Sequence, residues 1–274
     1  MKIVAVIVGT VVVACAFALP HWNLAEVDIG NGDESVHVYY INLDKAIDRR
    51  NAIVPLLSQL DLSYKRIAAV YGKELSQSEK DEVTDGTMFK VLMGKGIVDG
   101  EIGCYISHLK TWKEFLKSKA SYALIIEDDA TFNPAELKAV VDELIEHNDK
   151  WDYVNLDPHR SGNGRIVQKI SDKYNLIASK QRVWLTTCQL INRKAAASLV
   201  KHALPIRMPV DHYVYRSWEL GYKFRIVSPN AAGHGFGGSY IGSEDYSEKW
   251  YLKLTQQINR MISGAMCHIM AYMN

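Results

Sequence analysis

The sequence YALIIEDD, residues 122–129, joins five apolar or aromatic residues directly to three consecutive acids. An apolar run of this length that is rich in Ile is typical of a buried strand. Ligands of open α/β sheets bind outside the carboxyl ends of the strands, where these acids are expected to lie. Three adjacent carboxylates repel one another unless a cation offsets their charge, and a hard divalent ion can bind carboxylate and phosphate oxygens together. The stretch therefore favours a cation-dependent ligand site over its alternative, a solvated acidic turn.

Strands and helices are predicted to alternate on both sides of this stretch. Apolar runs with β-branched or aromatic residues predict strands over residues 36–43, 64–70, 122–126, 151–156, 185–191 and 223–227. Apolar residues at helical spacing predict helices over residues 45–60, from 100 and from 133 onward, and over 193–203, 211–220 and 248–272. We expect Asp44 to cap the first helix, Pro55 to kink it, and residues 72–100 to form a mobile loop. The alternation predicts an α/β sheet that is covered by helices on both faces.

The length and charge of the chain limit its organisation and its ligands. The chain has 274 residues and a formal net charge of +1, so it has no broad basic surface that would bind nucleic acid. An anionic ligand must instead be held by a few placed groups or by a metal ion. One domain is expected over residues 36–247, after a linker at 21–35 and before a C-terminal helix at 248–274. We expect this helix to pack on the domain, with contact to a membrane surface as the alternative.

Residues 1–20 are predicted to direct the chain to a membrane or to the secretory pathway. Residues 3–19 carry no charge, and as a helix they would span about 25 Å, slightly less than a hydrocarbon core. A cleaved signal peptide with Ala16 and Ala18 near the cleavage site and a short signal anchor both fit this pattern. Lipidation of Cys15 and a buried first strand are weaker alternatives. The localisation expected from the first two readings is secretory or membrane-associated, and lumenal in a eukaryote.

Two further blocks carry polar residues that can bind a ligand. In INLDKAIDRR, residues 41–50, a strand end is followed one helical turn later by Arg49 and Arg50, which could hold a diphosphate. Solvated arginines on a helix face are the alternative. In GEIGCYISHL, residues 100–109, His108 shares a helical stripe with Tyr105 and Trp112, so it is either a site residue or a buried core histidine.

Taken together, these blocks resemble glycosyltransferase family 25, which includes bacterial lipooligosaccharide galactosyltransferases and collagen hydroxylysine galactosyltransferases. The resemblance covers roughly residues 36–215 and keeps the order of the family's motifs. The matching stretches are VYYINLDKAIDRR, YKRIAAVYG, GEIGCYISHLKTW, YALIIEDDATF and, more weakly, PIRMPVDHYV.

The resemblance implies a GT-A-type nucleotide-sugar-binding sheet, a UDP-hexose donor with galactose as the expected sugar, Mn²⁺ or another divalent cation, and inversion at the anomeric carbon. The acidic triplet then acts as a DxD-like motif. Asp129 is the expected main metal ligand, and Glu127 and Asp128 would reach the metal, a metal-bound water, the ribose or the sugar. The other residues expected to contact the donor are Asn42, Asp44, Arg49, Arg50, Glu101 and His108.

Inversion also requires a general base that takes the proton from the acceptor hydroxyl. The candidate is Asp211, in the sequence PVDH just before a predicted helix, where a helix N-cap is the equally good alternative. His234, which lies between Gly233 and Gly235, could complete the metal shell, although a histidine at a glycine turn is also an ordinary loop residue.

The function expected from this resemblance is hexosyl transfer from a UDP-sugar to a glycan or to a hydroxylated protein side chain. The alternatives are a non-catalytic relative that binds nucleotide-sugars and a metal-dependent phosphohydrolase. The hydrolase usually needs a second ligand cluster to build a paired-metal site, and the sequence offers no convincing one. The sequence names neither the acceptor nor the hexose.

Overall fold

The computed structural model describes residues 32–33, 35–235 and 249–273. The predicted membrane-directed segment, residues 1–20, and most of the predicted linker lie outside the described residues. Among the helices of the described part, none is long and apolar enough to cross a membrane.

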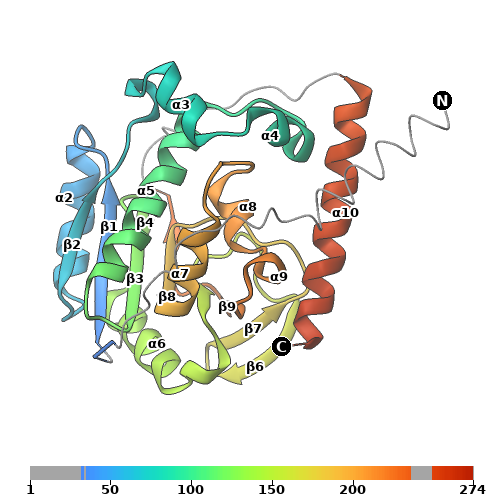
Figure 1. The fold of residues 1–274 in the computed structure, drawn as a ribbon. Coiled ribbons are helices and arrows are strands. Elements are labelled where there is room, and N and C mark those ends of the chain that lie inside the picture. The colour runs from blue at the N-terminus through green and yellow to red at the C-terminus, as the bar shows by residue number, and fades with distance from the viewer. Residues whose placement is uncertain (1–31, 34, 236–248, 274) are drawn as a thin grey trace.

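The core of the fold is an eight-stranded mixed sheet with the strand order β2-β1-β3-β8-β5-β9-β7-β6 (Figure 1). Its strands are β1 (Val36–Asn42), β2 (Tyr64–Ala68), β3 (Tyr122–Glu127), β5 (Tyr153–Asn155), β6 (Gly164–Lys169), β7 (Asn175–Ser179), β8 (Cys188–Asn192) and β9 (Phe224–Ser228). β1 runs parallel to β2 and β3, whereas β8 is antiparallel to both β3 and β5. A separate small sheet pairs β4 (Ala130–Thr131) with β10 (Gly233–His234).

Helices cover both faces of this sheet, because the side chains of each buried strand alternate between the two faces. Ala123 and Ile125 of β3 belong to the core cluster that contains α5 (Asp99–Lys117) and α7 (Arg193–His202). Leu124 and Ile126 belong to the other cluster, which contains α2 (Ile47–Ser58) and α6 (Pro134–Glu146). All four β3 side chains are 0% exposed. The predicted α/β sheet with helices on both faces is therefore confirmed.

The prediction of a mobile loop over residues 72–100 is wrong. This segment contains a 3₁₀ turn, η1 (Gly72–Glu74), and two short helices, α3 (Gln77–Val83) and α4 (Gly86–Met93). α3 begins with a capping box formed by Ser76 and Glu79, and Asp85 caps α4 by accepting a hydrogen bond from Met88 N–H. Helices of seven and eight residues are too short to show a sustained apolar period. Their N-terminal caps stabilise both helices, and the buried side chains of Phe89 and Met93 also stabilise α4.

Several smaller predictions also need correction. Asp44 does not cap α2, because the N-cap is Ala46 and Asp44 pairs with Arg66. The predicted helix at 211–220 is divided into α8 (Val210–Val214) and α9 (Ser217–Leu220). The β6–β7 hairpin was not predicted, because the half-exposed β6 shows no regular alternation of buried and exposed residues. α2 continues through Pro55, and the kink expected there stays a prediction.

The C-terminal helix α10 (Trp250–Met273) lies along one side of the domain, against α4, β6 and β7 (Figure 1). Its side chains bond to the end of α4, where backbone carbonyls have no intrahelical partner. Gln256 Nε2 donates to Met93 O at 2.6 Å, and Asn259 Nδ2 donates to Leu92 O at 3.0 Å. α10 therefore stabilises the C-terminal turn of α4.

Candidate active site

A pocket lies beside the carboxyl ends of the parallel strands β1 and β3, where Ile41 pairs with Glu127. The pocket is open to solvent and takes in about 670 Å³, part of it solvent outside the walls. It is bordered by the end of β1, the segment before and into η1, the first half of α5 and the acidic triplet. The lining residues are Ile41, Leu43, Arg49, Ala69, Val70, Tyr71, Gly72, Gly100, Cys104, Ser107, His108, Glu127, Asp128 and Asp129. The structure therefore brings together the three sequence blocks that were expected to form one site.

Asn42 joins the end of β1 to the acidic triplet. Its side-chain nitrogen donates to Asp128 Oδ2 at 2.7 Å and to Ala46 O at 3.0 Å. Its oxygen accepts from Arg50 Nε at 2.9 Å and from Arg66 Nε at 3.0 Å. These contacts satisfy both ends of a side chain that is 1% exposed, so they fix the position of Asp128.

Arg49 is the positive charge closest to the triplet. Its Nη1 lies 3.0 Å from Asp128 Oδ1 and 3.4 Å from Asp129 Oδ2. Arg50 instead bonds to the backbone oxygen of Asp44, whose carboxylate pairs with Arg66 at the solvent-exposed edge. Of the two predicted arginines, only Arg49 lines the pocket.

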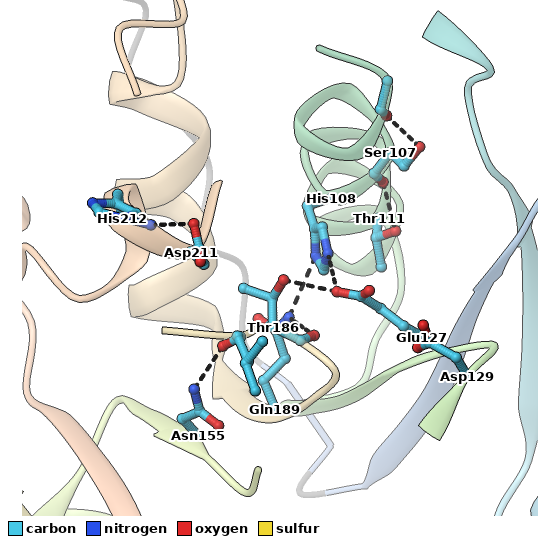
Figure 2. A network of polar contacts seen from close by, with 12 residues as sticks. Ser107, His108, Thr111, Glu127, Asp129, Asn155, Thr186, Gln189, Asp211 and His212 are labelled. Atoms are coloured by element: carbon cyan, nitrogen blue, oxygen red, sulfur yellow. Dashed lines mark hydrogen bonds and ion pairs between the residues drawn. The ribbon is translucent and has the colours of Figure 1, made fainter. Parts of the chain in front are cut away.

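Glu127 is held by a partly buried hydrogen-bond network (Figure 2). His108 Nε2 lies 3.0 Å from Glu127 Oε1, and Thr186 Oγ1 donates to the same oxygen at 2.7 Å. Burial alone would raise the pKa of Glu127, but the hydrogen bonds from His108 and Thr186 and the charge of Arg49 outweigh burial and lower this pKa. Glu127 is therefore a fixed carboxylate at neutral pH.

The same network determines which nitrogen of His108 carries the proton. Gln189 Nε2 donates to Thr186 O at 2.9 Å. Because a carbonyl oxygen can only accept, the side-chain nitrogen of Gln189, and not its oxygen, must point toward Thr186 O. This nitrogen also lies 3.3 Å from His108 Nδ1, and Tyr153 donates its hydroxyl proton to Gln189 Oε1 at 2.6 Å. His108 Nδ1 is then the acceptor, and Nε2–H donates to Glu127. His108 thus lines the pocket and is also buried in the core, at 1% exposure.

Asp129 is the triplet member best suited to a divalent cation. Burial, followed by the charge of Glu127, raises the pKa of Asp129 from 3.8 to about 6, because Arg49 only partly offsets them and Asp128 adds to them. Within the described residues, the only side chain that contacts the Asp129 carboxylate is Arg49, at 3.4 Å. A carboxylate crowded by like charges, with free lone pairs at a pocket wall, fits a hard cation with oxygen ligands.

A second possible metal group in the described residues consists of Cys104, His108 and Glu127, whose ligand atoms lie within 4.8 Å of one another. This group fits a hard cation less well. Burial, followed by the charge of Glu127, raises the pKa of the Cys104 thiol well above its usual value, so the thiolate is disfavoured. His108 Nε2 also donates its proton to Glu127.

Besides Asn42, Asp44 and Arg50, three further predicted residues lie outside the pocket lining. Glu101 accepts from Val98 N–H at 3.1 Å and pairs with Lys95 at 2.8 Å, so it serves the first turn of α5. His234 is adjacent to the triplet in space, because it pairs with Ala130 in the small sheet. Its Nδ1 lies 2.8 Å from Asp157 Oδ2.

Asp211 is the third of these residues. The capping alternative for it is wrong, because Pro209 is the N-cap of α8 and the Asp211 carboxylate accepts from the neighbouring His212 N–H at 2.8 Å. Its charge contributes to the raised pKa values of Cys104 and Tyr153, after burial and Glu127. Figure 2 shows Asp211 on α8, across from the His108–Glu127 pair.

Gly103 and Ser107 of the GEIGCYISHL block shape the pocket wall. The sequence did not reveal this role. A Cβ on Gly103 would lie 2.5 Å from Val70 O and 2.7 Å from Gly72 N. Ser107 Oγ accepts from Val70 N–H at 2.8 Å and donates to Gly103 O at 2.6 Å. α5 therefore lies directly against the backbone of residues 70–72, which line the pocket.

Gly103→Ala is expected to lower the free energy of unfolding by about 2–3 kcal/mol, because the new methyl group must displace backbone rather than a flexible side chain. Gly264→Ala in α10 is the matched control, because apart from the adjoining backbone of its own helix no described atom lies within 4 Å of its added Cβ. The control should be neutral or slightly stabilising through helix propensity. Chemical denaturation of both variants measures the difference, and equal stabilities would contradict the close approach.

Sequence reasoning also missed Arg66, Thr186 and Gln189. Arg66 was predicted only as part of a strand, and Thr186 and Gln189 come from the segment before and inside β8. An isolated Thr or Gln carries no sequence signal for such a role. Only the pairing of β8 beside β3 brings them to Glu127.

Comparison with known proteins gives a family match over most of the described domain. The family model of glycosyltransferase family 25 (LPS biosynthesis protein) matches residues 35–214. Procollagen galactosyltransferase 1-A of Xenopus laevis is 29% identical over 188 residues, which cover 65% of this chain and 30% of that protein. A glycosyltransferase 25 family member of Drosophila pseudoobscura pseudoobscura is 26% identical over 254 residues, which cover 83% of this chain and 40% of that protein. The chain thus spans less than half the length of these relatives.

Solved structures give weaker likenesses. A Drosophila beta-1,4-galactosyltransferase 7 mutant in complex with manganese, UDP-Gal and xylobiose has a TM-score of 0.41 at 9% identity, covering 81% of this chain and 79% of that chain. S. aureus TarS in complex with UDP-GlcNAc has a TM-score of 0.45 at 10% identity, covering 82% and 66%. No conclusion rests on likenesses of this size. The family match covers more than half of the chain and agrees with the motif blocks that meet at the pocket, and the chain therefore belongs to glycosyltransferase family 25.

Proposed function

We propose that this chain is a cation-dependent, inverting hexosyltransferase that uses a UDP-sugar, with galactose as the expected hexose. Membership in family 25 supports glycosyl transfer as the reaction class. The observation that carries the proposal is the crowded Asp129 carboxylate, with its pKa raised to about 6, at the wall of the pocket beside the β1 and β3 ends. Such a carboxylate favours a bound cation, and a cation in turn favours a diphosphate.

The donor side of the proposed mechanism relies on fixed charges. Asp129 would hold the cation, with Glu127 as a further ligand through Oε2, since Oε1 already accepts from His108 and Thr186. When bound, the ion would offset the negative charge that develops on the departing diphosphate. Arg49 holds Asp128 in place and adds a positive charge at the pocket wall, where donor phosphates can be bound.

The acceptor side relies on Asp211. In this proposal its carboxylate takes the proton from the acceptor hydroxyl as the oxygen bonds to the anomeric carbon. The bond from that carbon to the diphosphate breaks on the opposite face, and the electron pair leaves with UDP. A hydroxyl on a glycan or on a protein side chain would serve, and the relatives named procollagen galactosyltransferase support the second.

Removal of the metal tests the proposal. We expect UDP to bind at least about tenfold more tightly with Mn²⁺ than with chelator, because the acidic triplet repels an unshielded diphosphate. Titration calorimetry measures the two affinities, and UDP release from UDP-galactose with added acceptors then tests transfer. Equal affinities would contradict the cation-dependent site. Metal-dependent release of inorganic phosphate without sugar transfer would instead indicate a phosphohydrolase.

A further inference from the structure

The C-terminal helix α10 directs many polar side chains toward the domain, where most surface helices direct apolar ones. The buried positions include Thr255, Gln256, Asn259 and Ser263. Gln256 and Asn259 bond to the end of α4. The buried Arg216 donates to Asn259 Oδ1 at 3.3 Å and to Ser263 Oγ at 3.1 Å. A surface helix normally directs its apolar face toward the core, so the position of the apolar residues of α10 needs a separate explanation.

Large apolar side chains of α10 lie on its outward face. The exposed fractions are 64% for Trp250, 41% for Tyr251, 74% for Met261, 44% for Ile269 and 59% for Tyr272. At 3.6 residues per turn these five residues fall within an arc of about 100°, and Met273, which is 75% exposed, lies about 40° beyond it. We call the five residues the α10 apolar face. A helix of 24 residues is about 36 Å long, so this face forms a stripe along one side of the domain. Large exposed apolar side chains gathered along one helix face are typical of an interaction site.

The charges around the stripe select the partner. α10 contains Lys253 and Arg260, both exposed, and no Asp or Glu between residues 250 and 273. Neither cation forms an ion pair with any residue in the described part of the chain. Lys180 adds a third positive charge, 4.9 Å from the Tyr272 ring centroid. A second copy of the chain would bring charges of the same sign to this face, so the complementary partner is negatively charged.

We propose that the α10 apolar face binds the surface of a membrane that contains anionic lipids. Basic amphipathic helices lie in the plane of the interface, with the apolar face among the acyl chains and the cations at the headgroups. Trp250 and Tyr251 at one end of the stripe and Tyr272 at the other suit the headgroup boundary, because these rings have an apolar body and a polar edge. This inference does not depend on the proposed reaction or on residues 1–20.

A fluorophore on α10 tests the contact independently of any other membrane-binding segment. An environment-sensitive label is attached to the full chain at Met261→Cys, and the chain without an introduced cysteine gives the background. The matched control carries the label at Ile47→Cys, on the helix α2, where the residue is 56% exposed. The label at 261 should be quenched by nitroxide-bearing lipids in vesicles of phosphatidylcholine and phosphatidylglycerol, and the label at 47 should not.

Charge and apolar variants then test the two parts of the proposal. Lys253→Glu with Arg260→Glu should weaken partitioning of α10 into these vesicles at least about fivefold per cation. Met261→Glu with Ile269→Glu should weaken it at least about tenfold, with an unchanged melting temperature because both residues are exposed. No quenching at position 261, or equal quenching at 47, would overturn the proposal. It would also be overturned by a dimer in sedimentation velocity that Met261→Glu dissociates, because the face would then bind a second copy.

Discussion

Asp129→Asn is expected to lower the rate of sugar transfer by about 10³-fold or more, because a cation that stabilises charge on the leaving group contributes several kcal/mol. The substitution keeps the shape of the side chain and removes its charge. Initial rates of UDP release at saturating donor measure the effect, together with the affinity for Mn²⁺. A variant that transfers sugar at the normal rate would remove Asp129 from the proposed metal site.

The same substitution is expected to stabilise the metal-free protein. Burial and the charge of Glu127 raise the pKa of Asp129 to about 6, so the ionised carboxylate is disfavoured in the folded state. The free-energy cost of ionising Asp129 in the folded state is absent below the usual pKa of 3.8. It grows as the pH rises from 3.8 through about 6, the pKa of Asp129 in the folded state, and is complete above that pH. The gain in unfolding free energy of Asp129→Asn should therefore grow between pH 4 and pH 7, to about 1–3 kcal/mol.

Asp128→Asn is the control that separates the two acids. Asp128 accepts from Asn42 and pairs with Arg49 at 3.0 Å, so loss of its charge removes a charge-assisted contact. This variant should be less stable than the unaltered chain by about 1–2 kcal/mol. Thermal unfolding of both variants in chelator would show opposite shifts, and parallel shifts would contradict the different roles assigned to the two acids.

Asp211→Asn is expected to reduce turnover by roughly 10²-fold or more, with nearly normal binding of UDP and metal. The amide keeps an oxygen that can still accept from His212 N–H, so the local structure of α8 is retained, while the basicity is lost. Because Asp211 is not the N-cap of α8, a purely structural role would give a small change in melting temperature and unchanged turnover. Unchanged turnover would exclude Asp211 as the base.

Much of the fold was predictable because its central strand is fully buried. β3 has an apolar run that is typical of a buried strand, and α5 shows a long helical stripe that includes Tyr105, His108 and Trp112. α3 and α4 were not predictable in this way, because one turn of apolar period is too little to distinguish from a loop. The β6–β7 hairpin lies at the edge of the sheet, where burial does not impose alternation.

The candidate site was predictable where strand ends carry it. Asn42 ends β1, Glu127 ends β3 and Asp128 and Asp129 come directly after it, and parallel pairing brings these strand ends to one edge. The hydrogen bonds that fix Glu127 could not be predicted, because Thr186 and Gln189 reach it only through the antiparallel insertion of β8 between β3 and β5. The role of Gly103 could not be predicted either, because it depends on how closely α5 approaches residues 70–72.

This insertion of β8 has a consequence for how the protein is made. Thr186 and Glu127 are 59 positions apart along the chain, so synthesis delivers β1, β2, α5 and β3 well before their last partner. A nascent chain that ends before β8 can pair three strands, but β3 then has an open edge and Glu127 has no hydroxyl partner. Closing such a long loop costs chain entropy, and this cost is offset only after the contacts between β8 and β3 have formed. The hydrogen bond from Thr186 that fixes Glu127 therefore forms only after synthesis has passed residue 186, and shorter nascent chains leave the apolar edge of β3 without its β8 partner.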